Sequence, residues 1–389
     1  MDDLLPPGVL ARIASRAGEA EATCDLAEDL AALTELGVLM APLPAGEDGI
    51  GLGTEPGGTA ACVDLLVRIG AANLSLARLM EGHVNAVKLV VLYGTPATRT
   101  RAFAIVRSGG LLGVWGADAA TPVALRSDCG GLVLAGAKRF ASGLGNVAAA
   151  LVTAASPSGD GPQLILVPAD DAARADASVW RQSGMRATRS GIYVLDGLRI
   201  EPDMLVGRPG DLLREPYFEG GVWRYCAAHL GGAQALYRAM VRRLVETGRA
   251  DDPHQARRVF EAASACETAR LWIESAAAKV EGQGAAPVEP EAAAAYALMA
   301  REATETACLT VMDRTERALG TAAFEEGDVD RIRRDLSLFL RQAAPDAKRA
   351  RAARTLVATG WCETAGCEAD GERVPCVPDF PRAAAGGRS

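Results

Sequence analysis

Two arginines lie beside two hydroxyl side chains in the segment RATRSG, which spans residues 186–191. Arg186 and Arg189 carry planar guanidinium groups, which form paired hydrogen bonds with phosphates and carboxylates. Thr188 and Ser190 add hydroxyls that suit the same ligands. The segment therefore predicts one of two arrangements: an anion-binding turn, or a strand edge whose charges are simply solvated.

A third arginine stands in the segment VWRYCAAHLGG, residues 222–232, whose other side chains are mostly apolar. Arg224 would be a buried cation in such a helix, and a buried cation requires a partner. His229 lies five positions later on a different face of the helix, where a lone histidine is typical of a packed core. Arg224 therefore predicts either a substrate contact or a structural ion pair.

Three regions of the chain, which differ in the spacing of their apolar residues, must position these side chains. In residues 7–107 and 216–359, apolar side chains recur every three or four positions, which indicates amphipathic helices. Between them, residues 110–207 contain short apolar runs separated by Gly, Asp, Ser and Pro, which is typical of closely spaced antiparallel strands. The sequence predicts an α+β fold with four parts: an N-terminal helical domain (1–109), a middle antiparallel β-domain (110–210), a C-terminal four-helix bundle (211–360) and a flexible tail (361–389).

Composition excludes several classes of protein. The net charge of −8 is spread along the 389 residues, which argues against a nucleic-acid binder. The sequence has no run of about 18 apolar residues, so no membrane span is expected. The N-terminus carries acids where a signal peptide carries bases, and six of the nine cysteines lie in apolar stretches. We therefore expect a cytoplasmic protein with reduced, buried thiols and no metal site.

The order of these regions and four segments resemble the acyl-CoA dehydrogenase family. The similarity extends from about residue 30 to about residue 359. The segment WRQSGMRATRSGIYVLDGLRIEPDMLVG is the most specific of the four, and the others are LGVLMAPLPAGEDGIGLG, SLARLMEGHVNAVKLVVLYGT and GLVLAGAKRFASG. The resemblance implies the fold of that family, in which a flavin-binding β-domain lies between two helical domains.

The resemblance assigns flavin contacts to the middle domain. In the family, a hydroxyl binds the flavin ring and an aromatic side chain two positions earlier packs on it, and these roles fall on Ser142 and Phe140. A flavin ring needs one flat apolar face and hydrogen bonds along its polar edge. Trp115 stands where the family has a threonine, so it is either a flavin contact or a core residue. Thr121 stands where the family has a serine, and keeps a hydroxyl that would bind the flavin.

Substrate contacts follow from the resemblance in the same way. The family uses the neighbourhood of Arg186, Arg189 and Ser190 near the mouth of its acyl-CoA tunnel. The arginine at the position of Arg224 enters the substrate cavity in the family. Both assignments add a family role to residues that already suit an anionic ligand.

Two motifs that contact FAD across the family's dimer are altered in this sequence. The segment LVETGRADDPHQARR keeps Arg249 and Gln255 but has no Phe-Gly pair and is several residues shorter. The glycine-rich loop keeps Gly320 but has Thr321 and Ala323 at glycine positions, where side chains restrict the backbone and the approach of a phosphate. The resemblance implies FAD, and the departures leave FMN or no flavin as alternatives.

The proton-abstracting carboxylate of the family is missing. Its usual position after the Arg-Asp pair at 334–335 falls on Ala343, and the alternative position before Arg224 falls on Trp223. Neither a methyl group nor an indole accepts the proton, and general-base catalysis requires a group within hydrogen-bond reach. Glu219 and Asp346 lie close by in sequence, each as a displaced base or a surface acid.

Three functional hypotheses remain open on this sequence. The first is a flavoprotein oxidoreductase that acts on an acyl thioester or a related small substrate. It would use a displaced base and pass its electrons to electron-transferring flavoprotein. The second is a flavin-dependent monooxygenase or oxidase of the same fold, which activates oxygen and does not need the glutamate. The third is a non-catalytic acyl-CoA-binding or partner subunit. The resemblance also implies a homodimer or homotetramer.

Overall fold

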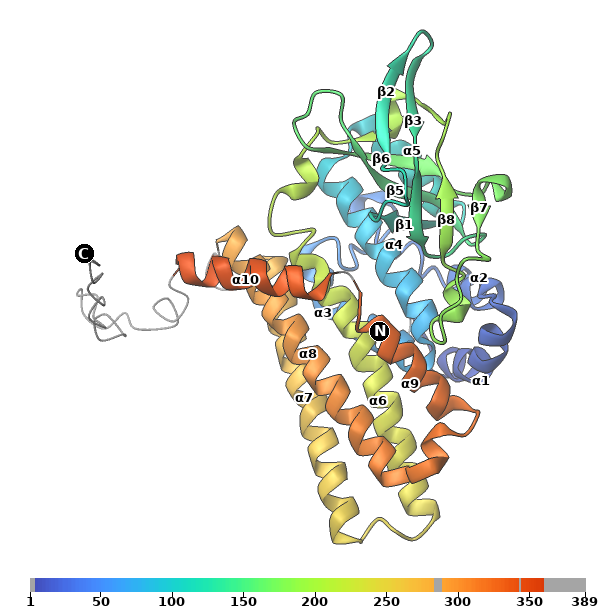
Figure 1. Ribbon diagram of the computed structural model, residues 1–389, viewed down its shortest axis with the longest axis vertical. Helices are drawn as coiled ribbons and strands as arrows, with labels where there is room; N and C mark the ends of the chain where they lie inside the picture. Colours follow the sequence, from blue (N-terminus) through green and yellow to red (C-terminus); the bar gives the residue numbers. More distant parts are fainter. Residues whose placement is uncertain (1–3, 283–288, 343, 360–389) are drawn as a thin grey trace, which may run out of the picture.

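The computed structural model describes residues 4–282, 289–342 and 344–359, and the elements follow the expected order (Figure 1). The strands gather at one end of the molecule, and long helices extend from them to the other end. The predicted α+β class, with N-terminal helices, a middle β-domain and a C-terminal helical bundle, is confirmed. The predicted flexible tail and Ala343 lie outside the described residues.

The N-terminal helices begin and end at recognisable signals. The Asn73 side chain caps α4 by accepting hydrogen bonds from the backbone N–H groups of Ser75 and Leu76. Pro96 opens α5 directly after Thr95, whose hydroxyl caps the helix. The helices of this region are α1 Pro7–Thr23, α2 Ala27–Glu35, α3 Thr59–Ala72, α4 Leu74–Tyr93 and α5 Pro96–Arg107.

Within the described ranges, the strands form a seven-stranded and a three-stranded sheet. Most neighbours pair antiparallel, as expected, but β5 pairs in parallel with β1 and β2, so the larger sheet is mixed. Parallel pairing needs a long connection, and residues 116–146 provide it between β1 and β5. The strands are β1 Leu111–Trp115, β2 Ala124–Asp128, β3 Gly131–Ala135, β4 Ala137–Ala141, β5 Val147–Ala155, β6 Pro162–Pro168, β7 Ala175–Asp176, β8 Gly191–Val194, β9 Arg199–Ile200 and β10 Leu205–Val206.

Helix α6 packs against α7, α8 and α9, and it also lies against α3 and α4 of the N-terminal region, whereas α10 lies on α8. Because α6 contacts both helical regions, its N-terminal turns lie inside the molecule rather than on the bundle surface. The helices are α6 Trp223–Glu246, α7 Pro253–Val280, α8 Pro290–Leu319, α9 Asp328–Phe339 and α10 Pro345–Thr359.

His83 joins three parts of the chain at the inner face of α4. One ring nitrogen lies 2.8 Å from the Leu39 carbonyl, and the other accepts a hydrogen bond from the Leu112 N–H at 3.0 Å. Burial lowers the pKa of His83 to about 4, and that of His229 to about 3. Both rings are therefore neutral core groups at physiological pH, as expected for His229.

The remaining global expectations concern membranes, thiols and metals. Among the described helices, none combines the length and the apolar character of a membrane span. The six cysteines in the described ranges are free thiols. Three of them are buried as expected, but Cys24 and Cys266 are half-buried, and Cys129 is exposed because it lies in the turn between β2 and β3. No group of three or more His, Cys, Asp or Glu side chains in this part of the chain could hold a metal ion.

The two buried histidines predict a loss of stability in acid. The pKa of His83 falls from 6.5 in the unfolded chain to about 4, so its stabilising contribution is complete above pH 6.5 and is lost as the pH falls through this interval. The contribution is roughly 3 kcal/mol. In urea unfolding, the free-energy difference between wild type and His83→Gln should therefore shrink from about pH 7 to about pH 5.

His254 is the matched control because it is exposed at the start of α7. His254→Gln should leave the free energy of unfolding at pH 7 within about 0.5 kcal/mol of wild type. Parallel pH profiles for wild type and His83→Gln would contradict the neutral, buried state of His83.

Candidate functional site

Three buried hydroxyls form a chain where β4 ends. The Ser190 hydroxyl donates to Ser142 Oγ at 3.1 Å, and Thr188 Oγ1 lies 2.9 Å from Ser190 Oγ. The pairing of β4 with β8 produces this arrangement, because Ala141 stands opposite Gly191 and brings the two serines together. The structure thus joins predicted residues from two different sequence motifs.

Phe140 is an exposed aromatic side chain on strained backbone. Its φ of 54° lies in the left-handed region, which is unusual for a bulky residue, and the pairing of β4 with β8 shifts register between Arg139 and Ala141 at this point. The Phe140 side chain is 50% exposed and meets the Trp180 ring edge to face. Such strain costs about 1–3 kcal/mol and concentrates at functional sites. The bulge therefore presents an aromatic face beside the buried Ser142.

Trp115 supports this segment from inside the β-domain. It is 2% exposed, its indole N–H donates to the Ser142 carbonyl at 3.1 Å, and its ring packs on Tyr193. Of the two alternatives for Trp115, this placement favours the core residue. Thr121 is exposed on the loop between β1 and β2, and its carbonyl accepts a hydrogen bond from Ala137. Both flavin assignments stay predictions.

Arg186 and Arg189 extend into solvent from the turn that carries the hydroxyls. Within the described ranges, neither guanidinium has a hydrogen bond or an ion pair with another side chain. Arg139, on the adjacent strand, lies with its guanidinium carbon 4.7 Å from the Phe140 ring centre. Three exposed guanidiniums therefore accompany the exposed aromatic ring, and free guanidiniums suit a phosphate.

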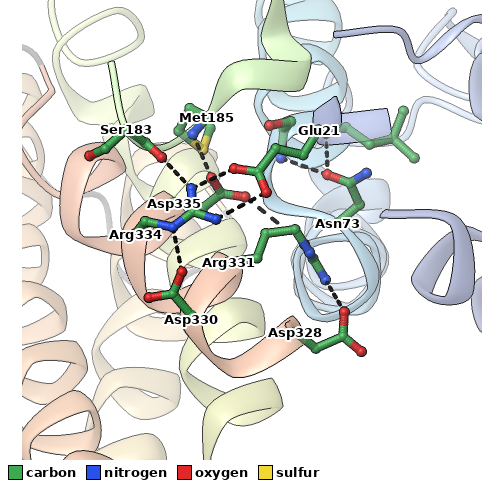
Figure 2. Close-up of polar contacts among 11 residues, drawn as sticks. Glu21, Asn73, Ser183, Met185, Asp328, Asp330, Arg331, Arg334 and Asp335 are labelled. Atoms are coloured by element: carbon green, nitrogen blue, oxygen red, sulfur yellow. Dashed lines mark hydrogen bonds and ion pairs between the residues drawn. The ribbon is translucent and has the colours of Figure 1, made fainter. Parts of the chain in front are cut away.

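Helix α9 holds the turn in place (Figure 2). The Asp335 carboxylate accepts a hydrogen bond from the Met185 backbone N–H, and Arg334 donates to the Ser183 carbonyl. Arg334 also forms an ion pair with Glu21 of α1, with Nη2 and Oε2 3.0 Å apart. The Arg-Asp pair, which served in the sequence as a landmark, thus ties the β-domain to both helical regions.

Gly184 and Asp335 show how tightly this contact is built. A Cβ atom on Gly184 would lie 2.3 Å from the Arg334 carbonyl oxygen, so a side chain does not fit there. Burial raises the pKa of Asp335 to about 6, while the hydrogen bond from Met185 and the charge of Arg331 act in the opposite direction. The ionised carboxylate is therefore held in an environment that disfavours its charge.

A second group of polar residues lies buried where α4, α6 and α7 meet. Arg224 is fully buried, and its Nη2 donates to Glu281 Oε1 at 2.7 Å and to the Gly53 carbonyl at 3.1 Å. Glu281 also forms an ion pair with Lys88 at 2.8 Å. The structural ion pair left open by the sequence is therefore present, and Trp223 donates its indole N–H to the same Glu281 oxygen at 3.2 Å.

Sequence reasoning missed the polar face of α4. Arg78, Glu81, Asn85 and Lys88 recur at helical spacing, and Glu81 and Lys88 are 6% and 5% exposed. Arg78 Nη1 donates to Glu81 Oε1 at 2.5 Å, and burial raises the pKa of Glu81 against the opposing effects of Arg78 and Arg224. Polar residues in register on a largely apolar helix were the available signal, because such residues are rarely buried without a partner.

The structure offers no free carboxylate at the described base positions. Trp223 is fully buried against Glu281, and Ala343 lies outside the described residues. The weak candidate Glu219 forms ion pairs with Lys348 at 2.5 Å and Arg351 at 3.7 Å. Asp346 is 93% exposed in its side chain, so it is the surface acid.

The two altered FAD motifs lie together at the far end of the bundle. Arg249 donates to the Ala318 carbonyl, two residues before Gly320. Gly320 is exposed and has a φ of 65°. Gln255 keeps a buried Oε1 atom without a hydrogen-bond partner in the described part of the chain. The Arg249 guanidinium therefore already bonds a backbone carbonyl in the last turn of α8, directly before the loop.

The fold matches solved structures over almost its whole length. FMN-bound TdsC from Paenibacillus sp. A11-2 superposes with a TM-score of 0.79 at 20% identity, covering 90% of this chain and 96% of that chain. Methanesulfinate monooxygenase MsuC from Pseudomonas fluorescens gives 0.77 at 18% identity, covering 90% and 95%. Nitrososynthase from Micromonospora carbonacea var. africana gives 0.76 at 21% identity, covering 92% and 95%.

This chain has the acyl-CoA dehydrogenase fold. The expectation drawn from the sequence motifs is confirmed at the level of the fold. No protein-family model and no curated protein matches the sequence. At about one identical residue in five, the likeness establishes the architecture, and the assignments of individual residues stay predictions.

The contact between Asp335 and Met185 predicts a distinctive pair of variants. Asp335→Asn keeps an oxygen acceptor for the Met185 N–H, whereas Asp335→Ala leaves this N–H unpaired and should be less stable than Asp335→Asn by about 1–3 kcal/mol in urea unfolding. Asp346→Asn, at an exposed position, is the control and should be neutral. Equal stabilities of Asp335→Asn and Asp335→Ala would show that the hydrogen bond contributes nothing.

The raised pKa of Asp335 adds a pH signature to the same variants. Its pKa rises from 3.8 to about 6, so the stability that this group contributes is complete below pH 3.8 and is lost as the pH rises through about 6. Relative to wild type, Asp335→Asn should gain about 3 kcal/mol across this interval. The sign is opposite to that of His83, so the two variants are distinguishable.

Proposed function

We propose that this chain is a flavin-dependent oxidoreductase that carries out oxygen chemistry on a small substrate. The observation that carries the flavin assignment is the strained, half-exposed Phe140 beside the buried hydroxyl chain of Ser142 and Ser190. A flat apolar face next to hydrogen-bonding groups is what a flavin ring requires. The fold, shared with the FMN-bound TdsC structure, supports this assignment.

The residues present fit a flavin in three respects. Phe140 offers the ring face, and Ser142 offers a hydroxyl whose contact to the Phe140 carbonyl is long at 3.5 Å, so it retains hydrogen-bonding capacity. Arg186 and Arg189 offer free guanidiniums for a phosphate. Trp115 acts as a positioning residue because it holds the Ser142 carbonyl. A bound flavin would supply two-electron redox chemistry and, when reduced, reactivity towards oxygen.

We propose FMN rather than FAD as the flavin. The resemblance implies that the motifs at Arg249 and Gly320 contact FAD across the dimer, with the loop amides at its pyrophosphate, and here Arg249 bonds a backbone carbonyl while Thr321 and Ala323 replace loop glycines. FMN has no pyrophosphate and ends in a single phosphate that suits the free arginines. FMN bound to TdsC is consistent with this choice, and FAD is the alternative that cofactor extraction tests.

Oxygen chemistry is favoured over desaturation because the described residues offer no carboxylate that is free to remove the α-proton of an acyl thioester. Trp223 occupies one usual base position, and the displaced candidate Glu219 is bound by Lys348 and Arg351. The similar structures MsuC and 3-HSA hydroxylase from Rhodococcus sp. RHA1 are named as a monooxygenase and a hydroxylase. A dehydrogenase acting on an acyl thioester, with electron-transferring flavoprotein as acceptor, and a non-catalytic acyl-CoA-binding subunit are the competing functions.

Assembly and location complete the proposal. Large apolar side chains are exposed on the bundle helices, including Val245 of α6 and both Phe260 and Leu271 of α7. Such exposed groups are common at interfaces between subunits, which supports a homodimer or homotetramer formed through the bundle. A cytoplasmic location agrees with the free thiols in the described ranges.

Variants of the aromatic and hydroxyl groups test the flavin site. Phe140→Ala and Ser142→Ala should each weaken FMN binding about tenfold or more, because each removes about 1.4 kcal/mol of contact. The measurement is the quenching of FMN fluorescence on titration with protein. The exposed side chains of Leu213 and Ser158 provide the controls Leu213→Ala and Ser158→Ala, which should bind FMN as wild type does.

The same FMN titrations also test the turn that carries Arg186 and Arg189. The double variant Arg186→Gln/Arg189→Gln should lower the preference for FMN over riboflavin, since the lost contacts are to the phosphate. Arg126→Gln, on exposed β2, is the matched control. A purified protein that is colourless and takes up neither FMN nor FAD would overturn both enzyme functions.

Reaction type is decided by how the bound flavin is reduced and reoxidised. Anaerobic mixing with acyl-CoA thioesters should leave the flavin absorbance unchanged, because the two usual base positions hold Trp223 and Ala343, whose side chains accept no proton. When a separate reductase supplies reduced flavin, oxygen should instead reoxidise it, and the substrate should be oxidised in the same reaction. Bleaching by acyl-CoA alone would establish the dehydrogenase, and its persistence in Glu219→Gln would exclude Glu219 as the base.

A further inference from the structure

A cavity of about 210 Å³ lies between α1 and α2 and shares no residue with the proposed flavin site. Its apolar wall comes from both helices, with Val9 and Ile13 on α1 and Ala31 and Ala32 on α2. Because an apolar cavity of about 150 Å³ can hold a benzene molecule, this cavity has room for a small organic molecule. The charged side chains around it decide which kind of molecule it suits.

Asp29 is the buried charge of this cavity. It is 3% exposed, and its Oδ2 atom is fully enclosed without a hydrogen-bond partner in the described part of the chain. Burial raises the pKa of the Asp29 carboxyl, and the opposing charge of Arg16 does not cancel this effect. A desolvated carboxylate without a partner costs stability, so Asp29 lacks a counter-charge.

Within the described ranges, neither arginine of the cavity forms an ion pair with Asp29. Arg16 forms its ion pair with Glu28 instead, and Arg12 is exposed at the rim. Glu35 adds a further exposed carboxylate there. With two arginines against three acids, the lining carries one uncompensated negative charge. The cavity therefore combines an apolar wall, a buried carboxylate and a negative balance of charge.

We infer that this cavity binds a small free primary ammonium ion with an apolar body, and that the Asp29 carboxylate is its principal ligand. The ammonium group supplies the missing positive charge and donates hydrogen bonds to the carboxylate. The apolar body is removed from water against Val9 and Ile13. A neutral alcohol or a carboxylate of the same shape fills the space but does not supply the charge.

Matched probes separate charge from shape. In phosphate buffer, which contains no amine, butylammonium chloride should raise the melting temperature of the purified full chain by at least about 1 °C. Butanol and sodium butyrate have similar shapes and should produce no such rise at the same concentration, with ionic strength matched by sodium chloride. Saturation-transfer NMR of the butyl protons detects the bound ammonium ion directly and requires no flavin.

Asp29→Asn tests the principal ligand because it keeps the shape of the side chain and removes its charge. It should weaken butylammonium binding at least about tenfold. Without amine, it should melt no lower than wild type, since it removes a desolvated charge. Glu19→Gln is the matched control, because Glu19 is exposed on α1 and lies outside the cavity lining. The same change of net charge there should leave binding within about twofold of wild type.

A second variant fills the cavity without changing its charge. Ala31→Leu, at an exposed position of α2 in the lining, should weaken butylammonium binding at least about threefold, because the added carbons occupy the space of the ligand. Ala11→Leu, exposed on α1 outside the lining, is its control and should bind as wild type does. Leucine is a good helix former, so both helices should persist.

Three outcomes would overturn the inference. An absent response of wild type to butylammonium would leave Asp29 as a structural carboxyl, and equal responses to butylammonium and butanol would leave an apolar cavity without a charge requirement. Unchanged binding in both Asp29→Asn and Ala31→Leu would place the amine elsewhere. Nα-acetyl-lysine methylamide carries the same ammonium chain on a peptide backbone. If it bound as tightly as butylammonium, a lysine of another protein would replace the free amine as the occupant.

Discussion

The hydrogen bond from the Met185 N–H to the Asp335 carboxylate is the contact on which the proposed flavin site depends. It fixes the turn that carries Thr188 and Ser190, and through Ser190 it fixes the position of Ser142. The hydrogen bond forms even though burial disfavours the charge of the Asp335 carboxylate and raises its pKa. A charged acceptor in a dry setting is strong when satisfied and costly when not, so the turn is held in one conformation.

Helix α4 is the second organising element, because it contacts three other parts of the molecule. His83 joins it to the Leu39 carbonyl and to β1, and Leu79 packs against the turn next to Ser142. Its polar residues meet Arg224 and Glu281 in the interior.

The proposed site combines a strained surface element with a charged interior. Phe140 adopts a positive φ where the pairing of β4 with β8 shifts register, and Arg224 keeps two buried nitrogen donors without an acceptor in the described part of the chain. Both features cost stability, and both are explained if a ligand completes them. At the far end of the bundle, in contrast, Arg249 donates a hydrogen bond to the Ala318 carbonyl. This agrees with a cofactor that does not contact Arg249.

The sequence by itself determined the α+β order, because helical and strand periodicity are local properties of the chain, and motif order identified the fold. It also located Phe140, Ser142 and the RATRSG turn. Tertiary structure alone decided that Trp115 lies behind Ser142 and that Glu219 is engaged by Lys348. It alone placed Glu281, 57 positions away, against Arg224. Such pairings depend on how helices distant in sequence pack together, and no local periodicity encodes which buried charges will meet.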